Sequence, residues 1–111
     1  MRAWDAMAIA LPLSAMRYRL MNDYSADWPF WGDGEDAGLC AAGTPALPAD
    51  LEADIRAWAA CFNDQFSWEY GWPDEETTAA HKAEGERLHR CVQRALPEHD
   101  IVLNYWERSV R

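Results

Sequence analysis

The sequence predicts a single small α+β domain, in which a small antiparallel sheet packs on a helical hairpin. Two short segments with alternating apolar residues lie near the two ends of the chain. Between them lie two longer segments whose apolar residues recur at spacings of three and four. The chain has 111 residues, which is the size of one domain. The expected order is strand, long loop, helix, helix, strand.

The first predicted strand is Arg17–Tyr24, in which arginines alternate with Tyr18 and Leu20. The last is Asp100–Glu107, which carries apolar groups on both faces and is typical of a covered strand. A helical hairpin between them returns the chain to its starting end, so we expect the two strands to pair antiparallel. A sheet of two strands is weak alone. The long loop, the helices or a second subunit is therefore expected to complete it.

The first predicted helix runs from Asp50 to about Phe66. Its apolar stripe consists of Leu51, Ile55, Trp58, Phe62 and Phe66. The second predicted helix runs from Asp74 to Leu96, with Asp74 as its N-cap and Pro97 as its stop. Gly85 is unfavourable inside a helix, and we expect it to allow a close approach to the first helix.

The segment between Asn22 and Pro48 is rich in Asp, Gly and Pro, and it predicts a long irregular excursion. Its aromatic residues Trp28, Phe30 and Trp31 are expected to anchor it to the body of the protein. The domain is expected to span residues 16–111. Residues 1–15 are interpreted as an N-terminal extension or arm.

The formal net charge is −9, which argues against binding to nucleic acid or to an anionic membrane, since both need a basic face. No apolar stretch approaches the ~20 residues that span a bilayer. The three cysteines are widely spaced and odd in number, which is typical of free thiols in a reducing cytoplasm. We therefore expect a cytoplasmic protein.

No catalytic or cofactor motif stands out, and we expect a protein that is not an enzyme and has no cofactor. His81 and His89 lack the i, i+4 spacing of a helical zinc pair, so the histidines are interpreted as scattered surface residues and no metal site is expected. Cys61 and Cys91 lie towards the middle or end of their predicted helices, where the dipole opposes a thiolate. There is no phosphate loop and no dinucleotide fingerprint.

Aromatic and acidic residues are both enriched in the first two thirds of the chain. Seven tryptophans occur in 111 residues, and several cluster at 28–31 and 66–72. Between Asn22 and Glu76, thirteen acidic residues stand against one basic residue, Arg56. This composition favours a surface that binds a basic protein such as a toxin or nuclease, since Trp and Tyr concentrate binding energy and acids steer a cationic partner. The predicted contact residues are Trp28, Trp31, Asp33, Glu35, Asp36, Trp68, Glu69, Tyr70, Trp72 and Asp74.

Other readings of the same residues stay open. The tryptophans can be core residues and the acids solvated surface. Aromatic residues beside acids also suit a Trp-lined pocket for a small ligand or a carbohydrate. A structural homodimer that uses its strand edge or its N-terminal arm is a further alternative.

The stretch from Met16 to Tyr24, followed by Trp28–Trp31, resembles the opening of a group of short bacterial proteins. The resemblance continues through Arg56-Ala-Trp58, through Gly71-Trp72 and through Glu84–Arg87. It implies a domain that starts near Met16, and it implies no catalytic residue. By analogy, small acidic bacterial proteins of this kind are often immunity proteins that are paired with secreted toxins. We therefore expect an immunity or inhibitor protein that blocks a basic toxin or nuclease by steric occlusion.

Overall fold

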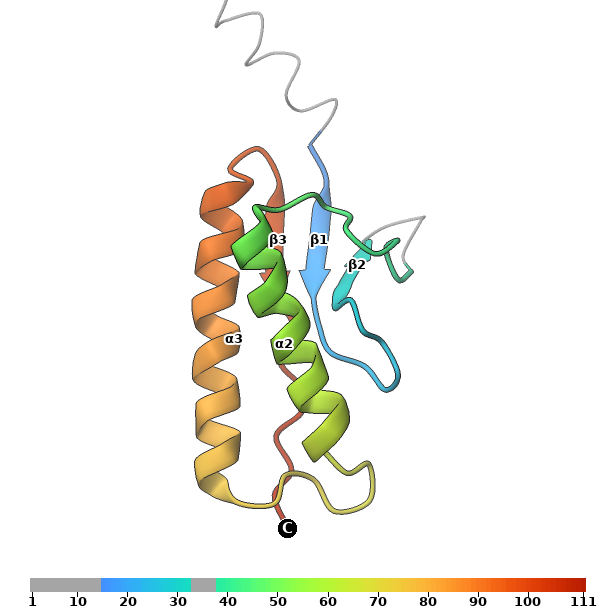
Figure 1. Ribbon diagram of the computed structural model, residues 1–111, viewed down its shortest axis with the longest axis vertical. Helices are drawn as coiled ribbons and strands as arrows, with labels where there is room; N and C mark the ends of the chain where they lie inside the picture. Colours follow the sequence, from blue (N-terminus) through green and yellow to red (C-terminus); the bar gives the residue numbers. More distant parts are fainter. Residues whose placement is uncertain (1–14, 33–37) are drawn as a thin grey trace, which may run out of the picture.

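The computed structural model describes residues 15–32 and 38–111, which form three strands and two helices (Figure 1). In chain order these are β1 (Arg17–Leu20), β2 (Phe30–Gly32), α2 (Ala49–Gln65), α3 (Glu75–Ala95) and β3 (Asp100–Leu103). The predicted α+β class is confirmed, and both helices lie close to their predicted bounds. The predicted arm lies almost wholly outside the described residues. Within those residues, neither helix combines the length and apolarity of a membrane span.

The sheet is mixed, with the strand order β2–β1–β3. Strand β2 runs antiparallel to β1, whereas β3 runs parallel to β1, with Tyr18 opposite Ile101. The prediction that the first and last strands pair antiparallel was therefore wrong. Each element reverses the direction of the one before it, and β2 adds a reversal that the prediction did not count (Figure 1). The fifth element thus runs in the direction of the first.

Strand β2 comes from the segment that was predicted to be a long irregular loop. Trp28 and Phe30 are buried there, so the predicted anchoring of this segment by aromatic residues is confirmed for them. Beyond β2, the chain at 38–40 adds two backbone hydrogen bonds, from Gly32 N to Gly38 O and from Cys40 N to Phe30 O, each of 2.9 Å. The excursion therefore completes the sheet on one side.

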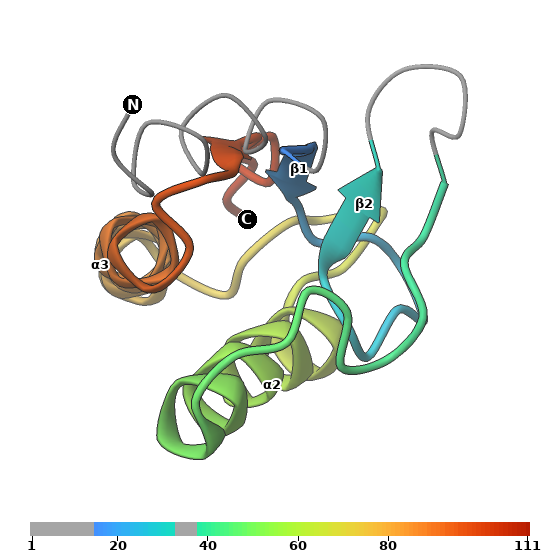
Figure 2. The same ribbon diagram turned by 90° about the horizontal axis from the view of Figure 1, so that it is seen from above.

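The two helices cover one face of the sheet (Figure 2). That face presents Tyr18, Leu20, Phe30 and Ile101, which alternate with half-buried or exposed residues along their strands. The helices meet it with residues from their apolar stripes, and the buried ones are Ile55, Trp58, Leu88 and Val92. The core therefore lies between the hairpin of helices and the sheet.

The free edge of β3 is covered by side chains from α3. Gln93 accepts a hydrogen bond of 3.0 Å from the backbone N–H of Ile101 and donates one of 2.7 Å to the carbonyl of His99. His89 Nε2 lies 2.6 Å from the carbonyl of Ile101, to which it can only donate. These contacts occupy backbone groups that an added strand would need.

Candidate functional site

A tight turn between α2 and α3 holds two aromatic rings out in solvent. Ser67 and Gly71 exchange two backbone hydrogen bonds, of 3.0 and 2.7 Å. The Ser67 hydroxyl also accepts from the backbone N–H groups of Glu69 and Tyr70. The turn leaves Trp68 79% exposed and Tyr70 59% exposed. Solitary exposed apolar residues are common, but a neighbouring Trp and Tyr on one ordered turn are not.

The base of this turn is fixed to the C-terminal segment. Gly71 has φ +79°, and a Cβ there would overlap the backbone of Ser109, so only glycine fits. The next residue, Trp72, is fully buried, and its indole donates a 2.9 Å hydrogen bond to the carbonyl of Glu107. Its backbone N–H bonds to Ser109 O at 2.8 Å, and its carbonyl accepts from Arg111 at 3.0 Å. The exposed rings therefore project from a rigid support.

A groove of about 500 Å³ lies between α2 and α3 beside the same turn. Its residues are Asp54, Ala57, Trp58, Cys61, Gln65, Asp74, Glu76, Thr77, Ala80, His81 and Glu84. Arg87 lies at one end, where it contacts Asp54 at 3.0 Å and Glu84 at 2.6 Å. These carboxylates hold the pKa of Arg87 above its usual range, which keeps it charged. The groove is thus rimmed by four carboxylates.

Asp74 caps α3 at the other end of the groove, as predicted. Its carboxylate accepts a 2.7 Å hydrogen bond from the backbone N–H of Thr77. This backbone bond, with a smaller contribution from the Thr77 side chain, lowers the pKa of Asp74 below its ordinary value of 3.8. Asp74 is therefore a fixed negative charge at neutral pH.

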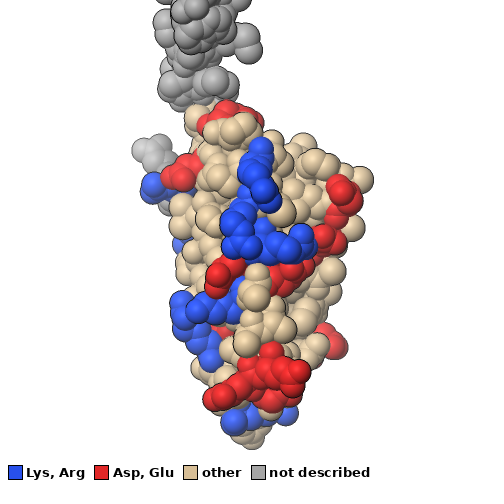
Figure 3. Space-filling view, turned by 90° about the vertical axis from the view of Figure 1, so that its left-hand side faces the viewer, with Lys and Arg blue, Asp and Glu red and all other residues tan. Residues whose placement is uncertain are grey.

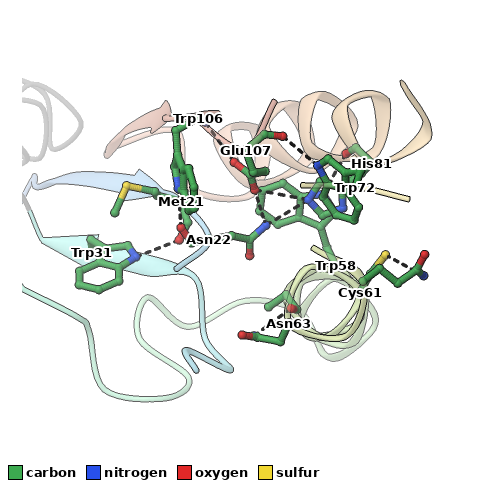
Figure 4. Close-up of polar contacts among 12 residues, drawn as sticks. Met21, Asn22, Trp31, Trp58, Cys61, Asn63, Trp72, His81, Trp106 and Glu107 are labelled. Carbon is green, nitrogen blue, oxygen red and sulfur yellow. Dashed lines mark hydrogen bonds and ion pairs between the residues drawn. The ribbon is translucent and has the colours of Figure 1, made fainter. Parts of the chain in front are cut away.

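Three polar side chains from distant parts of the sequence meet in the core behind the groove (Figure 4). Asn22 follows β1, His81 lies in α3 and Glu107 lies in the C-terminal segment, and all three are buried. The amide nitrogen of Asn22 donates to Glu107 Oε2 at 2.9 Å and lies 3.2 Å from His81 Nε2. His81 Nε2 in turn lies 3.4 Å from the same carboxylate oxygen. This cluster joins the sheet, the helices and the C-terminal segment.

Aromatic rings enclose this polar cluster. The His81 ring stacks on Trp58 with centroids 4.8 Å apart and an interplanar angle of 9°, and it lies 4.4 Å from the ring of Trp72. The Trp58 indole donates to the carbonyl of His81 at 3.0 Å, and the Trp106 indole donates to that of Asn22 at 2.7 Å. His81 Nδ1 and Asn22 Oδ1 are buried and have no partner among the described residues. The prediction that the histidines are scattered on the surface was therefore wrong for His81.

A signal for the burial of His81 does exist in the sequence. His81 precedes Gly85, Leu88 and Val92 at spacings of four, three and four, so it extends the buried stripe of α3. No comparable signal marks Glu107, because its burial depends on contacts with residues far away in the chain.

Beside the cluster, Tyr105 is nearly buried, and its hydroxyl has no partner among the described residues. Burial, together with the nearby carboxylate of Glu107, raises its pKa to about 12, while Arg108 acts in the opposite direction. A phenolate is thus strongly disfavoured at this position.

A comparison with protein families matches residues 16–108, a range that contains every described strand and helix as well as Glu107. The matching family is described as Serratia CdiI immunity protein-like. The chain belongs to this family. The resemblance to bacterial immunity proteins that was drawn from the sequence is thereby confirmed. No curated protein matches the chain in sequence.

Within this immunity family member, the predicted contact residues fall into separate places. Trp28 and Trp72 are core residues, 3% and 0% exposed, because their rings pack between the helices and the strands or the C-terminal segment. Trp31 is half-buried in β2, where it lies opposite Arg19 and donates to Met21 O at 2.9 Å. The burial of Trp28 and Trp72 removes them from the surface that a partner can touch.

The remaining predicted contacts lie near one another or outside the described residues. Trp68, Glu69, Tyr70 and Asp74 are all exposed, and all belong to the connection between α2 and α3. Asp33, Glu35 and Asp36 lie outside the described residues. Of the predicted contacts, the structure therefore leaves Trp68, Glu69, Tyr70 and Asp74 exposed on the connection at the end of the helical hairpin.

The charge on this immunity family member is uneven along α3. Figure 3 shows basic side chains over the upper and middle parts of that face, with acidic ones beside them, and an acidic patch near the lower end with basic side chains below it. The first turn of α3 contributes Glu75 and Glu76, whereas Arg87, Arg90 and Arg94 lie further along the helix. An acidic patch thus lies at the start of α3, close in sequence to Trp68 and Tyr70.

Metal and thiol chemistry find little support in the described residues. No group of three or more potential ligands from His, Cys, Asp and Glu is placed there to hold a metal ion. The three cysteines are free thiols, and burial raises the pKa of Cys40 and Cys61. Burial thus opposes the thiolate that a nucleophilic cysteine at either position would need.

Proposed function

We propose that this protein binds a contact-dependent toxin and inhibits it without catalysis of its own. The match of residues 16–108 to the immunity family carries this proposal. The proposed contact surface is the connection between α2 and α3, with Trp68, Glu69, Tyr70 and Asp74.

The two exposed rings on this connection suit an interface centre. Trp and Tyr are the residues most enriched among those that dominate binding energy, and Trp68 and Tyr70 have large exposed areas. The turn that carries them is already held by Ser67, Gly71 and the C-terminal segment. Binding would therefore order few groups, which favours affinity.

The charge of the surface supports a basic partner. The chain has a net charge of −9, and the exposed residues Glu69, Asp74, Glu75 and Glu76 are close in sequence to the exposed rings. Carboxylates around an aromatic centre speed the encounter with a cationic protein. Enzymes that cleave nucleic acid have positive active sites, so a nuclease toxin is the partner that this surface fits best. A rigid acidic projection would inhibit it by steric occlusion.

The test uses the products of the genes that flank the one for this chain, among which we expect the toxin. Co-expression with this protein should restore growth, and the two chains should co-purify. The double variant W68A/Y70A should weaken binding by about 2 kcal/mol or more, because it truncates both central rings. Leu39 is also exposed, at 49%, and lies outside the proposed surface, so L39A is the matched control. Failure of the unmodified protein to bind or protect would overturn the proposal.

The carbohydrate alternative needs a pocket lined by tryptophan, and the exposed rings of Trp68 and Tyr70 are not among the residues that line the groove. Trp58 is the tryptophan that lines the groove, and it is 3% exposed with its ring stacked on His81. Little of its face is left for a sugar ring. A homodimer through the edge of β3 would have to displace the contacts that Gln93 and His89 make there. No observation favours either alternative over toxin inhibition.

A further inference from the structure

Three aromatic rings from distant parts of the sequence meet where the turn between α2 and α3 begins. Tyr24 lies in the loop after β1, Phe66 caps the end of α2, and Trp106 lies in the C-terminal segment. The ring centroid of Tyr24 is 6.3 Å from that of Phe66 and 5.7 Å from that of Trp106, and the other two centroids are 5.6 Å apart. These rings, called the three-ring patch below, directly precede the turn at Ser67–Gly71.

Much of the three-ring patch is open to solvent. Tyr24 is 46% exposed and Trp106 is 36% exposed, while Phe66 is half-buried. Trp68 and Tyr70 follow two and four residues after Phe66. Of the six large apolar side chains that are exposed in the described part of the chain, four therefore belong to the patch or to the adjoining turn. Contiguous apolar surface of this kind is typical of an interaction site, whereas solitary exposed residues are not.

The segments that carry these rings are already fixed in place. Asn63 in α2 accepts a 2.8 Å hydrogen bond from the backbone N–H of Ser25 and donates one of 3.0 Å to the carbonyl of Ala26. The Trp106 indole donates to the carbonyl of Asn22 at 2.7 Å. The loop after β1 is thus tied to α2 and to the C-terminal segment. A partner that binds the patch would order few groups, which favours affinity.

The charge of the same segments favours a cationic partner. Residues 22–27, 62–70 and 104–108 contain four acidic residues that reach solvent and one basic residue, Arg108. The guanidinium of Arg108 lies over the ring of Tyr105, 5.4 Å from its centroid. Acidic residues around an apolar centre complement a partner whose surface is basic.

Asp23 brings negative charge up to the patch itself. Its carboxylate accepts a 2.8 Å hydrogen bond from the backbone N–H of Tyr24. Burial, together with the nearby carboxylates of Asp23 and Glu107, raises the pKa of the Tyr24 phenol above its ordinary value of 10.0. Among the described residues, no Lys or Arg forms an ion pair with Asp23. Its charge is therefore left for a partner to meet.

We propose that the three-ring patch is a second contact surface for the toxin. Tyr24, Phe66 and Trp106 pack against an apolar centre on the toxin, and the carboxylates around them face a basic rim there. Because the patch adjoins the turn that carries Trp68 and Tyr70, one continuous interface covers both. This inference rests on the proposed function and extends the contact surface to the loop after β1 and to the C-terminal segment.

Tyr24 is the position at which the patch is tested, since it is the most exposed of the three rings. The probe is the flanking-gene product that co-purifies with this protein. Y24A should weaken its binding roughly tenfold or more, as truncation of a central aromatic residue does. Leu39 is 49% exposed and lies outside the patch, so L39A is the matched control and should change the affinity by less than about twofold.

A pair of substitutions at the same position tests the charge of the partner. Y24Q and Y24K both replace the ring by a long flexible side chain, but only lysine is positive. Y24K should weaken binding more than Y24Q, and the difference should shrink at high salt because salt screens the repulsion. Equal affinities of the two variants would overturn the basic rim.

Hydroxyl-radical footprinting, read by mass spectrometry, distinguishes a contact from a residue that only supports the fold. In the complex, Tyr24 and Trp106 should react several times more slowly than in the free protein. Met16 is 48% exposed and precedes β1, at the other end of that strand from Tyr24, so its rate should not change.

The outcomes separate this inference from the function on which it rests. If the unmodified protein binds no flanking-gene product, both fall. If the toxin protects Trp68 and Tyr70 but leaves Tyr24 and Trp106 reactive, this inference alone falls, whatever Y24A does to stability or affinity. Binding of Y24A as tight as that of L39A would also overturn it. Protection of Tyr24 and Trp106 without protection of the turn would leave this inference standing and remove the turn as the contact surface.

Discussion

Gly85 in α3 lies directly against the indole of Trp58 in α2. A Cβ at Gly85 would stand 2.7 Å from Cζ2 of Trp58, a distance that side chains do not tolerate. The indole nitrogen of Trp58 also donates to the carbonyl of His81 in α3. The Trp58 ring therefore sets the distance between the two helices through two contacts, one with Gly85 and one with His81. The close approach predicted from Gly85 is thereby confirmed. The same ring forms the wall on which His81 is stacked.

We expect G85A to destabilise the protein, although alanine is the better helix former. Overpacking a core costs about 1–3 kcal/mol, and the gain in helix propensity returns at most about 1 kcal/mol. Unfolding in urea measures the net loss. Gly38 has nothing within 4 Å of its Cβ position, so G38A is the control and should stay within about 0.5 kcal/mol of the parent protein. Equal stability of G85A and G38A would show that the helices separate easily.

Removal of the Glu107 carboxylate should be among the most damaging single changes. Glu107 accepts from the buried amide of Asn22 and from the backbone N–H of Trp106, and its removal would leave the Asn22 donor buried without this acceptor. Leaving a buried hydrogen-bond donor without its acceptor costs about 1–3 kcal/mol. E107A should therefore lower the urea midpoint, and E86A, at an exposed position of α3, should hardly change it. A midpoint for E107A close to that of E86A would contradict a structural role for the cluster.

Tyr105 should make the fold sensitive to alkali. Its pKa rises from an ordinary value of 10.0 to about 12 in the folded chain. Between these values the unfolded state loses the proton first, so stability should fall as the pH rises through this range. Ultraviolet absorbance of phenolate, followed in the parent protein and in Y105F, identifies the late-titrating ring. If Y105F removes a group that titrates near 10, the burial argument fails.

The cap at Asp74 should make the stability of the fold fall as the pH is lowered, whereas Tyr105 makes it fall as the pH is raised. The pKa of Asp74 is lowered in the folded state, so its contribution is complete above its ordinary value of 3.8 and is lost as the pH falls through the lowered value. Melting temperatures measured from neutral pH to below 3.8 should fall more steeply for the parent protein than for D74N. Asparagine keeps a capping oxygen without the charge. Identical slopes for the two proteins would remove Asp74 as a source of acid sensitivity.

Local patterns in the sequence predicted the helices well. The apolar stripe of α2, the cap at Asp74 and the glycine in α3 are all features of residues close in sequence. The first strand was predicted too, although it ends at Leu20 rather than Tyr24. Strand β2 has three residues inside a segment rich in turn residues, and so short a strand leaves no periodic signal.

The candidate site was predicted only in part. Trp68 and Tyr70 were chosen because they belong to an aromatic and acidic cluster, but Trp28 and Trp72 satisfy the same description and are buried. Composition cannot separate a tryptophan that packs from one that projects. The contacts of Gly71 and Trp72 with the C-terminal segment decide this, and those residues are more than thirty positions apart.

The sequence by itself determined the fold class, the two helices and the acidic, aromatic character of the chain, because helix periodicity, capping and charge are properties of near neighbours. Only the tertiary structure decided that β3 runs parallel to β1, because that depends on the number of chain reversals between them. It also decided that Asn22, His81 and Glu107 meet in the core behind the groove, since these residues come from three distant segments. A buried polar cluster forms where the fold brings its members together, and no spacing along the chain announces it.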